Sequence, residues 1–331
     1  MFQNYEAPPG VGEGAGRIRR LRAALDERGL DAMLVPRADA HQAEVVPPGE
    51  ERLAWLTGFT GSAGLAIVGR ERAALFVDGR YTIQAAEQCA GTGLEIVHTA
   101  ETSAADWLKR HAAEMPRIGF DPWLHARAEI DRLEAAAPGA LRPVDDNPID
   151  ALWQDRPPPP MGAVTVHPES LAGEPSASKR ARLASELAAA GAAAAVLTLP
   201  DSIAWLLNIR GSDLAHVPVA LGFAILREDG TVALFMEPDK IDSGVRGHLG
   251  EAVTVEPPAA LGPALDALAG RTVRLDRQSC AVWIAQRLEG AGARIDWGPD
   301  PCLLPKAVKN ATEPAGMREA HLRDGVAMAR F

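Results

Sequence analysis

An internal repeat is the feature that most limits how this chain can fold. The segment Trp55–Ser62 (WLTGFTGS) recurs 150 positions later as Trp205–Ser212 (WLLNIRGS), with Trp, Leu, Gly and Ser at the same relative places. Each copy precedes two apolar runs, and Ala73–Asp78 (AALFVD) corresponds to Val232–Glu237 (VALFME). Matching residues in a matching order of elements indicate an internal duplication. We therefore expect two related α/β domains, each a mixed β-sheet flanked by helices.

The first half alternates between helical and strand-like patterns. Its first helix, 17–28, carries Ile18, Leu21 and Leu25 on one face and ends at Gly29, a residue typical of helix C-termini. Short apolar runs between turn residues predict strands. The strands are expected at 31–36, 65–68, 73–77, 94–98 and 117–120, and the further helices at 82–88, 104–114 and 126–136.

The second half repeats this order after a proline-rich segment. Pro157–Pro160 favours a stiff, extended linker. The expected helices beyond it are 178–190 and 281–289, and the expected strands are 194–199, 222–226, 232–236, 273–275 and 294–297. We therefore expect a flexible N-terminus at 1–16, a first domain at 17–156, a linker at 157–177, a second domain at 178–305 and the start of a further domain at 306–331.

A last helix is expected from Thr312 onward. Thr312 is a good N-cap, and Glu313 and Pro314 suit the first turn. No stop signal follows before Phe331, and the apolar residues of this helix have no evident partner. The sequence thus predicts that the chain is truncated within the first helix of that further domain.

Composition excludes several classes of function. The formal net charge of −10 leaves no basic surface for nucleic acid, and the arginine run Arg17–Arg22 is the polar face of an amphipathic helix. No signal peptide or long apolar span is present. Cys89, Cys280 and Cys302 are too scattered for a disulfide framework or a zinc site. These features predict a cytoplasmic protein that binds neither nucleic acid nor membrane.

A search for catalytic patterns predicts no catalytic or metal-ligating residue in this chain. None of the eight histidines lies at HxxxH spacing from another, and GxSxG is absent. Gly58, Gly61 and Gly64 lack the Lys-Ser/Thr of a phosphate loop and precede strands rather than a helix. Tight turns explain these glycines.

Two loops nevertheless combine charged and aromatic residues beside a glycine. The first is Asp78–Tyr81 (DGRY), and the second is Arg210–Asp213 (RGSD) with His216 three residues further on. In each loop Arg and Asp could pair with each other as a brace, or they could face a ligand or a neighbouring subunit. The candidate site residues are Arg80, Tyr81, Arg210, Asp213 and His216.

Three ordered motifs resemble those of a known family. Phe59–Gly64 (FTGSAG), followed by Asp78–Tyr81 and the QAA of residues 84–86, resembles the N-terminal domain of Xaa-Pro aminopeptidases of the long, three-domain type, which belong to the creatinase-like metallopeptidases. Leu206–Asp213 followed by Pro218 resembles the start of the second domain of these enzymes. The start of their catalytic domain resembles Lys306–Asn310, Glu313, Gly316–Arg318 and His321–Val326. The resemblance covers residues 17–331, and a departure at Ala215–Pro218, where the family often has His-Asn-Pro, weakens any role for that loop.

The resemblance implies an enzyme that removes the N-terminal residue preceding proline. In the family a third domain, of the pita-bread fold, holds two divalent metals, usually manganese, through two Asp, one His and two Glu, and the two metals share an activated water. These ligands lie beyond the counterpart of Phe331, so no cofactor is expected in this chain. The two domains would shape access for proline-containing peptides and support a homodimer, with the candidate residues lining the approach to the active site across the dimer.

Two alternatives stay open. One is a free-standing binding or assembly module with the same domains and no peptidase activity. The other is a creatinase or prolidase relative, but those proteins usually have one N-terminal domain, so the duplication and the Asp78–Tyr81 motif argue against it. The coding sequence after Phe331 would separate the first alternative from the peptidase.

Overall fold

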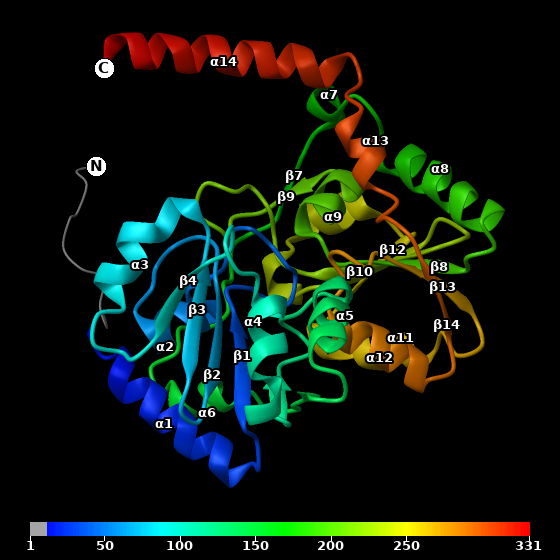
Figure 1. Cartoon of the computed structure of the whole chain (residues 1–331). Coiled ribbons are helices and arrows are strands. Elements are labelled where there is room, and N and C mark those ends of the chain that lie inside the picture. The colour runs from blue at the N-terminus through cyan, green and yellow to red at the C-terminus, as the bar shows by residue number, and fades with distance from the viewer. Residues whose placement is uncertain (1–11) are drawn as a thin grey trace. The chain divides into compact units, whose positions relative to one another are not determined.

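The computed structural model describes residues 12–331 and divides into two units (Figure 1). The first unit extends to Pro159 and includes Ala281–Trp283, and the second contains Pro160–Cys280 and Ile284–Phe331. Most of the flexible N-terminus predicted for 1–16 lies outside the described residues, and the first helix begins at Gly14.

The first unit is built on a six-stranded mixed sheet. The strand order is β4-β3-β2-β1-β5-β6. Strand β2 runs antiparallel to both β1 and β3, whereas the pairs β3–β4, β1–β5 and β5–β6 are parallel. The bounds are Ala32–Pro36 (β1), Leu65–Gly69 (β2), Ala73–Val77 (β3), Glu95–His98 (β4), Ile118–Phe120 (β5) and Leu141–Pro143 (β6).

The second unit contains a sheet of the same design. Its order is β12-β11-β10-β8-β13-β14, and each pair has the same direction as its counterpart in the first sheet. The bounds are Ala194–Leu197 (β8), Phe223–Arg227 (β10), Val232–Phe235 (β11), Val253–Glu256 (β12), Thr272–Leu275 (β13) and Arg294–Trp297 (β14). The predicted duplication of a mixed α/β domain is confirmed.

Helices cover both faces of the first sheet, which explains why its strands are almost entirely apolar. Alternate residues of β1 divide between two cores: Met33 and Val35 pack with α1, α2 and α6, while Ala32 and Leu34 pack with α4 and α5. Figure 1 shows the strands standing between α1 and α4. The bounds are Gly14–Glu27 (α1), Arg52–Thr57 (α2), Thr82–Gln88 (α3), Ala104–His111 (α4), Arg127–Ala136 (α5) and Pro148–Leu152 (α6).

The second unit contains the helices α7–α14. Leu183 of α8 and Leu206 of α9 pack on Leu197 and Ala224 of the sheet. The bounds are Glu169–Ala172 (α7), Ser176–Ala189 (α8), Pro200–Leu207 (α9), Ser243–Leu249 (α10), Leu261–Asp266 (α11), Val282–Gly290 (α12), Leu303–Ala307 (α13) and Thr312–Arg330 (α14). The 3-10 turns are Pro48–Glu50 (η1), Gly79–Tyr81 (η2), Ala112–Glu114 (η3), Pro238–Lys240 (η4) and Pro258–Ala260 (η5).

The repeated tryptophan belongs to a capping arrangement found in both units. In the first unit the Arg17 guanidinium donates to the Trp55 carbonyl and lies 4.8 Å from the ring centroid. In the second, Lys179 Nζ donates to the Trp205 carbonyl at 3.0 Å and lies 4.5 Å from that ring. A cation is favourable both at a helix C-terminus and over an indole ring. The motif therefore recurs because it ends α2 and α9 in the same way.

Short elements are the main difference from the sequence-based expectation. Helices α2 and α9 occupy stretches to which no helix was assigned. The segment predicted as the linker 157–177 contains α7 and the short strand β7 (Thr165–Val166), which pairs with β9 (Ile209–Arg210). Helix α14 forms where it was predicted, but Thr312 is its first residue and not its N-cap: Asn310 Oδ1 accepts from the Thr312 and Glu313 N–H groups at 3.0 and 3.2 Å. Every residue from Ala315 to Phe331 is exposed.

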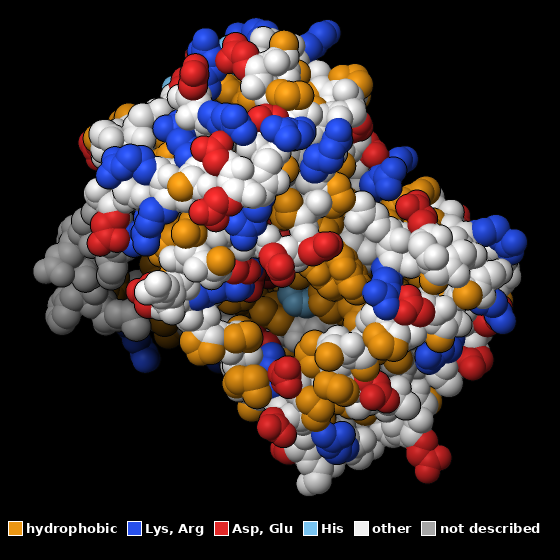
Figure 2. Space-filling model, turned by 90° about the horizontal axis from the view of Figure 1, so that it is seen from below, with side chains coloured by type: hydrophobic (Ala, Val, Ile, Leu, Met, Phe, Trp, Pro, Cys, Tyr) orange, Lys and Arg blue, Asp and Glu red, His pale blue; other side chains and the backbone are white. Residues whose placement is uncertain are grey.

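Surface charge is mixed on the face seen from below. Figure 2 shows Lys and Arg side chains interspersed with Asp and Glu over the described part of this face. Within residues 12–331, no helix is long and apolar enough to cross a membrane.

Candidate functional site

The first candidate loop, Asp78–Tyr81, is held together by an ion pair between its own residues. Asp78 precedes η2, and its carboxylate accepts hydrogen bonds from the Arg80 backbone N–H at 3.0 Å and from Arg80 Nη2 at 2.7 Å. These interactions lower the pKa of Asp78 to about 2 and raise that of Arg80. The pairing considered from sequence is therefore formed. The Arg80 side chain is still 61% exposed, so its outer face remains accessible to a ligand.

Tyr81 joins this turn to the glycine-rich segment after α2. Its hydroxyl lies 2.5 Å from Ser62 Oγ, and its ring meets Phe59 edge to face at 5.4 Å. The hydrogen bond to Ser62 lowers the pKa of Tyr81. Gln88 of α3 accepts from the Thr60 N–H at 2.9 Å. The segments Phe59–Gly64 and Asp78–Tyr81, which belong to the first of the three family-like motifs, thus form one surface.

A cavity of about 300 Å³ lies beside this surface. It is lined by Ala63, Gly64, Leu65, Phe76, Asp78, Thr99 and Ala104. Asp78 of the first candidate loop lines this cavity, but Arg80 and Tyr81 do not. Asp78 is the only charged group in the lining, and Arg80 already neutralises it.

The second loop is organised differently from the first. Asp213 does not pair with Arg210: its carboxylate accepts from Lys240 Nζ at 2.8 Å, from the Gly162 N–H at 2.8 Å and from the Leu221 N–H at 2.6 Å. The Asp213 side chain is completely buried. Sequence reasoning missed Lys240, although it is one of only five lysines in a chain rich in arginine. Asp213 therefore acts inside the loop and is not available to a ligand.

Arg210 and His216 are the more accessible members of this loop. Arg210 is half-buried, donates to the Ile209 carbonyl at 2.8 Å, and has a pKa lowered by its burial. His216 is exposed and has a φ of 63°, in the left-handed region that few residues other than glycine adopt readily. The structure thus leaves Arg80, Tyr81, Arg210 and His216 as surface candidates.

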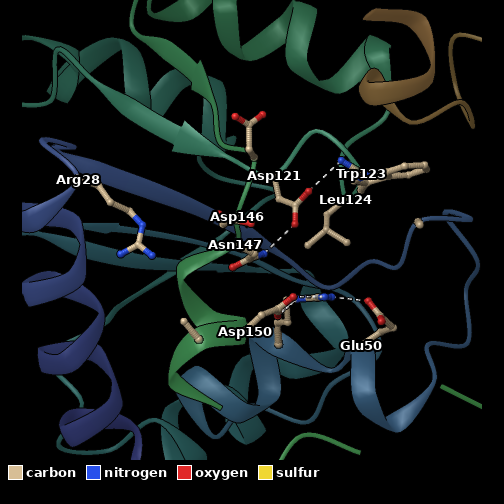
Figure 3. Close-up of a pocket in the computed structure, with 12 residues that line it drawn as sticks. Arg28, Glu50, Asp121, Trp123, Leu124, Asp146, Asn147 and Asp150 are labelled. Atoms are coloured by element: carbon tan, nitrogen blue, oxygen red, sulfur yellow. Dashed lines mark hydrogen bonds and ion pairs between the residues drawn. The ribbon is translucent and has the colours of Figure 1, made fainter. Parts of the chain in front are cut away.

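A larger cavity, which sequence reasoning missed, lies where the parallel strands β1, β5 and β6 end (Figure 3). Its volume is about 520 Å³. Ligands of open α/β sheets bind at the carboxyl ends of parallel strands. The one available signal was an Asp directly after a strand in both halves, at Asp121 and Asp276. The lining is Arg28, Ala40, Glu50, Arg52, Asp121, Trp123, Leu124, Asp145, Asp146, Asn147, Asp150 and Ala151.

Neither unit offers a metal centre within residues 12–331, where no group of three or more His, Cys, Asp and Glu side chains is arranged to hold an ion. The described residues therefore do not fit a dinuclear metal site, and no chemical step can be assigned to them through one. The three cysteines are buried, and burial raises the pKa of Cys89 to about 11.

Asp300, which follows β14, is a buried carboxylate that should make the stability of the second unit depend on pH. Asp300 Oδ1 accepts from the Cys302 N–H at 2.7 Å, but Asp300 Oδ2 has no hydrogen-bond partner within the described chain. Burial raises the pKa of Asp300. The folded state therefore holds this proton more tightly than the unfolded state, and its stability falls as pH rises through the folded-state pKa.

We expect Asp300→Asn to stabilise the second unit at neutral pH. The amide keeps the acceptor for Cys302 and carries no charge to bury. Thermal unfolding should show a gain of about 2–4 °C at pH 7, the shift given by ~1 kcal/mol in a unit of this size, and no gain near pH 3. Asp229→Asn is the control, and it should lower the unfolding temperature at pH 7. Hydrogen bonds from Thr231 lower the pKa of Asp229, so the ionised carboxylate stabilises the folded state. An equal gain at both pH values would contradict the assignment.

The architecture and its sites define a protein made of a tandem pair of α/β domains, each built on a six-stranded mixed sheet. Residues 17–152 and 155–313 each match the creatinase/prolidase N-terminal domain, and the chain belongs to that family.

Similar proteins carry the name Xaa-Pro aminopeptidase. A probable Xaa-Pro aminopeptidase P of Aspergillus niger is 34% identical over 95% of this chain and 53% of its own length. One from Coccidioides posadasii is 34% identical over 100% of this chain and 52% of its own length. The crystal structure of an X-prolyl aminopeptidase from Caenorhabditis elegans, described as a cytosolic enzyme with a di-nuclear active site, matches with a TM-score of 0.85 and 28% identity, covering 98% of this chain and 55% of that one. The chain thus spans about half the length of these relatives.

Proposed function

We propose that this chain is the non-catalytic N-terminal part of a metal-dependent Xaa-Pro aminopeptidase. The observation that carries the proposal is the match of nearly the whole chain, as a tandem pair of N-terminal domains, to about half of an X-prolyl aminopeptidase. The two metals, and the residues that hold them, would lie in the part of the relatives that has no counterpart here. The name of the Caenorhabditis elegans enzyme supports a cytoplasmic location and a dinuclear site, for which manganese is the metal we propose.

In this proposal the two units control access to the active site and support a homodimer. Arg80 and Tyr81 are positioned for this role because their exposed surface is held in shape from beneath by Asp78 and Ser62. Arg210 and His216 would contribute from the second unit, on a loop fixed by buried Asp213. The substrate would be a peptide with proline in its second position.

The purified 331-residue chain should not release the N-terminal residue of Xaa-Pro peptides, with or without added Mn²⁺. We expect its rate to equal that of buffer, measured by mass spectrometry of the peptide over several hours. The Caenorhabditis elegans enzyme, assayed in parallel, is the positive control. Mn²⁺-dependent cleavage by the purified chain would show that the catalytic residues lie within these 331 and would reject the proposal.

Arg80→Ala tests the access and dimer roles. In a complete enzyme carrying these two domains, we expect kcat/KM for Xaa-Pro peptides to fall about tenfold or the dimer to weaken, because an exposed charged group at the approach is lost. Steady-state kinetics and light scattering measure the two effects. Arg110→Ala, on the exposed side of α4, is the matched control. Unchanged kinetics and mass would leave Arg80 only its brace to Asp78.

A further inference from the structure

The cavity at the ends of β1, β5 and β6 contains more negative charge than its arginines balance. Arg52 binds Asp150 through Nε at 2.6 Å and Nη2 at 2.9 Å, and Arg156 binds Asp150 at 2.8 Å and Glu50 at 2.6 Å. These two carboxylates and two guanidinium groups neutralise one another. Figure 3 shows Asp150 and Glu50 at one end of the cavity and Arg28 at another side.

Asp121 lies at the centre of the lining and has no counter-ion. Its carboxylate accepts from the Trp123 N–H at 3.0 Å and from Asn147 Nδ2 at 2.9 Å, and both donors are neutral (Figure 3). It forms no ion pair within the described residues, although it is only 8% exposed. Burying an ionised carboxylate without a counter-charge is costly. A positive group in the cavity would remove that cost.

A second buried carboxylate, next to the cavity, has one oxygen without a hydrogen-bond partner among the described residues. Asp39 directly precedes Ala40 of the lining, is 1% exposed, and has an Oδ2 atom with no hydrogen-bond partner in the described chain. Its other oxygen accepts from the His41 and Ala43 N–H groups at 3.0 and 3.1 Å. Burial raises the pKa of Asp39, and the nearby charge of Glu50, a lining residue, acts in the same direction, whereas His41 and the backbone hydrogen bonds act against it.

The size and lining of the cavity indicate what kind of cation would fit. A volume of about 520 Å³ exceeds what a bare ion needs and falls in the range of small-molecule sites. Leu124 and Trp123 supply apolar surface beside the carboxylates. The described residues also lack a metal-ligating group of three side chains. We propose that this cavity binds an organic cation, a guanidinium or primary ammonium group on a short aliphatic chain, with Asp121 as its principal partner.

This site would be distinct from the surface of Arg80 and Tyr81, because none of their residues lines it. It does not depend on the proposed peptidase role. The second unit provides an internal control. Asp276 follows β13 as Asp121 follows β5, and its two oxygens also accept from neutral donors, the Gln278 and Asp300 backbone N–H groups at 2.8 and 3.0 Å, but Asp276 does not line this cavity.

Calorimetric titration of the 331-residue chain with n-butylguanidinium tests the proposal, and n-butylurea is the uncharged probe of the same shape. We expect n-butylguanidinium to bind at one site and to raise the unfolding temperature, and n-butylurea to bind at least about tenfold more weakly. Asp121→Asn should weaken n-butylguanidinium binding at least about tenfold, whereas Asp276→Asn should leave it unchanged.

Because Asp121→Asn could also disturb the Asn147 contact, Ala151→Phe is the second variant. Ala151 is an exposed lining residue, so a larger side chain there should fill the cavity and abolish binding without altering the carboxylates. The proposal is overturned by equal binding of the two probes, by binding that survives both Asp121→Asn and Ala151→Phe, or by stabilisation with Mg²⁺ in place of n-butylguanidinium.

Discussion

Replacing Lys240 by Met should lower the free energy of unfolding of the second unit by about 3–5 kcal/mol, the usual cost of removing one partner of a buried ion pair. The Lys240 and Asp213 side chains are 4% and 0% exposed. Methionine matches lysine in length but leaves the Asp213 carboxylate with only two backbone N–H groups and no counter-charge. Calorimetric unfolding of the chain would show the loss as a lower transition temperature for this unit.

Two further variants show whether the uncompensated charge causes the loss. Lys240→Met combined with Asp213→Asn should recover part of the stability, because the charge is gone although one backbone N–H loses its acceptor. Arg271→Met removes an exposed ion pair, Arg271 with Glu228, and should cost less than about 1 kcal/mol. If Lys240→Met cost no more than Arg271→Met, the buried pair would not be what fixes this loop.

The second large effect is expected at Gly61, a residue of the motif that carries the family resemblance. A methyl group placed on Gly61 would lie 2.2 Å from Cζ of Phe59, a ring that is itself 1% exposed. Gly61→Ala must therefore displace Phe59 and the Tyr81 ring that rests on it, at a cost of about 1–3 kcal/mol. Thermal unfolding would register this in the first unit.

Gly79→Ala is the matched control for this substitution. Gly79 belongs to the neighbouring motif, and a methyl group there would meet nothing within 4 Å. We expect its unfolding temperature to stay within about 1 °C of that of the unaltered chain, since surface changes are usually nearly neutral. Similar losses from Gly61→Ala and Gly79→Ala would mean that the ring contact is not the reason for glycine at position 61.

The duplication and most long elements could be predicted because their signals are local. Strands buried on both faces are continuous apolar runs between turn residues, as Ala73–Val77 and Val232–Phe235 show. The short helices α2 and α9 were missed, since six or eight residues are too few for a helical period to be distinguished from an apolar run. The prolines at 157–160 predicted an extended linker, and the short elements β7 and α7 that follow them were therefore missed.

Most contacts of the site residues could not be predicted, because they join residues that are distant in the sequence. Asp213 was paired with its neighbour Arg210 as one possibility, whereas its partner is Lys240, 27 residues away. The acidic cavity is lined by segments that follow β1, β5 and β6, and β1 is distant in the chain from the other two strands. The pairing of β1 with β5 brings these segments together. By contrast, Asp78 and Arg80 are two residues apart, so their pairing could be anticipated.

The two sheets do not interleave: every strand of the first ends by Pro143, and every strand of the second begins at or after Ala194. During synthesis the first sheet can therefore be completed before any strand of the second has been made. Because chains fold domain by domain as they emerge, this order keeps two copies of one topology from exchanging strands. Circular permutation that divides either sheet between the two chain ends should remove that protection and favour misassembled, aggregation-prone species during refolding.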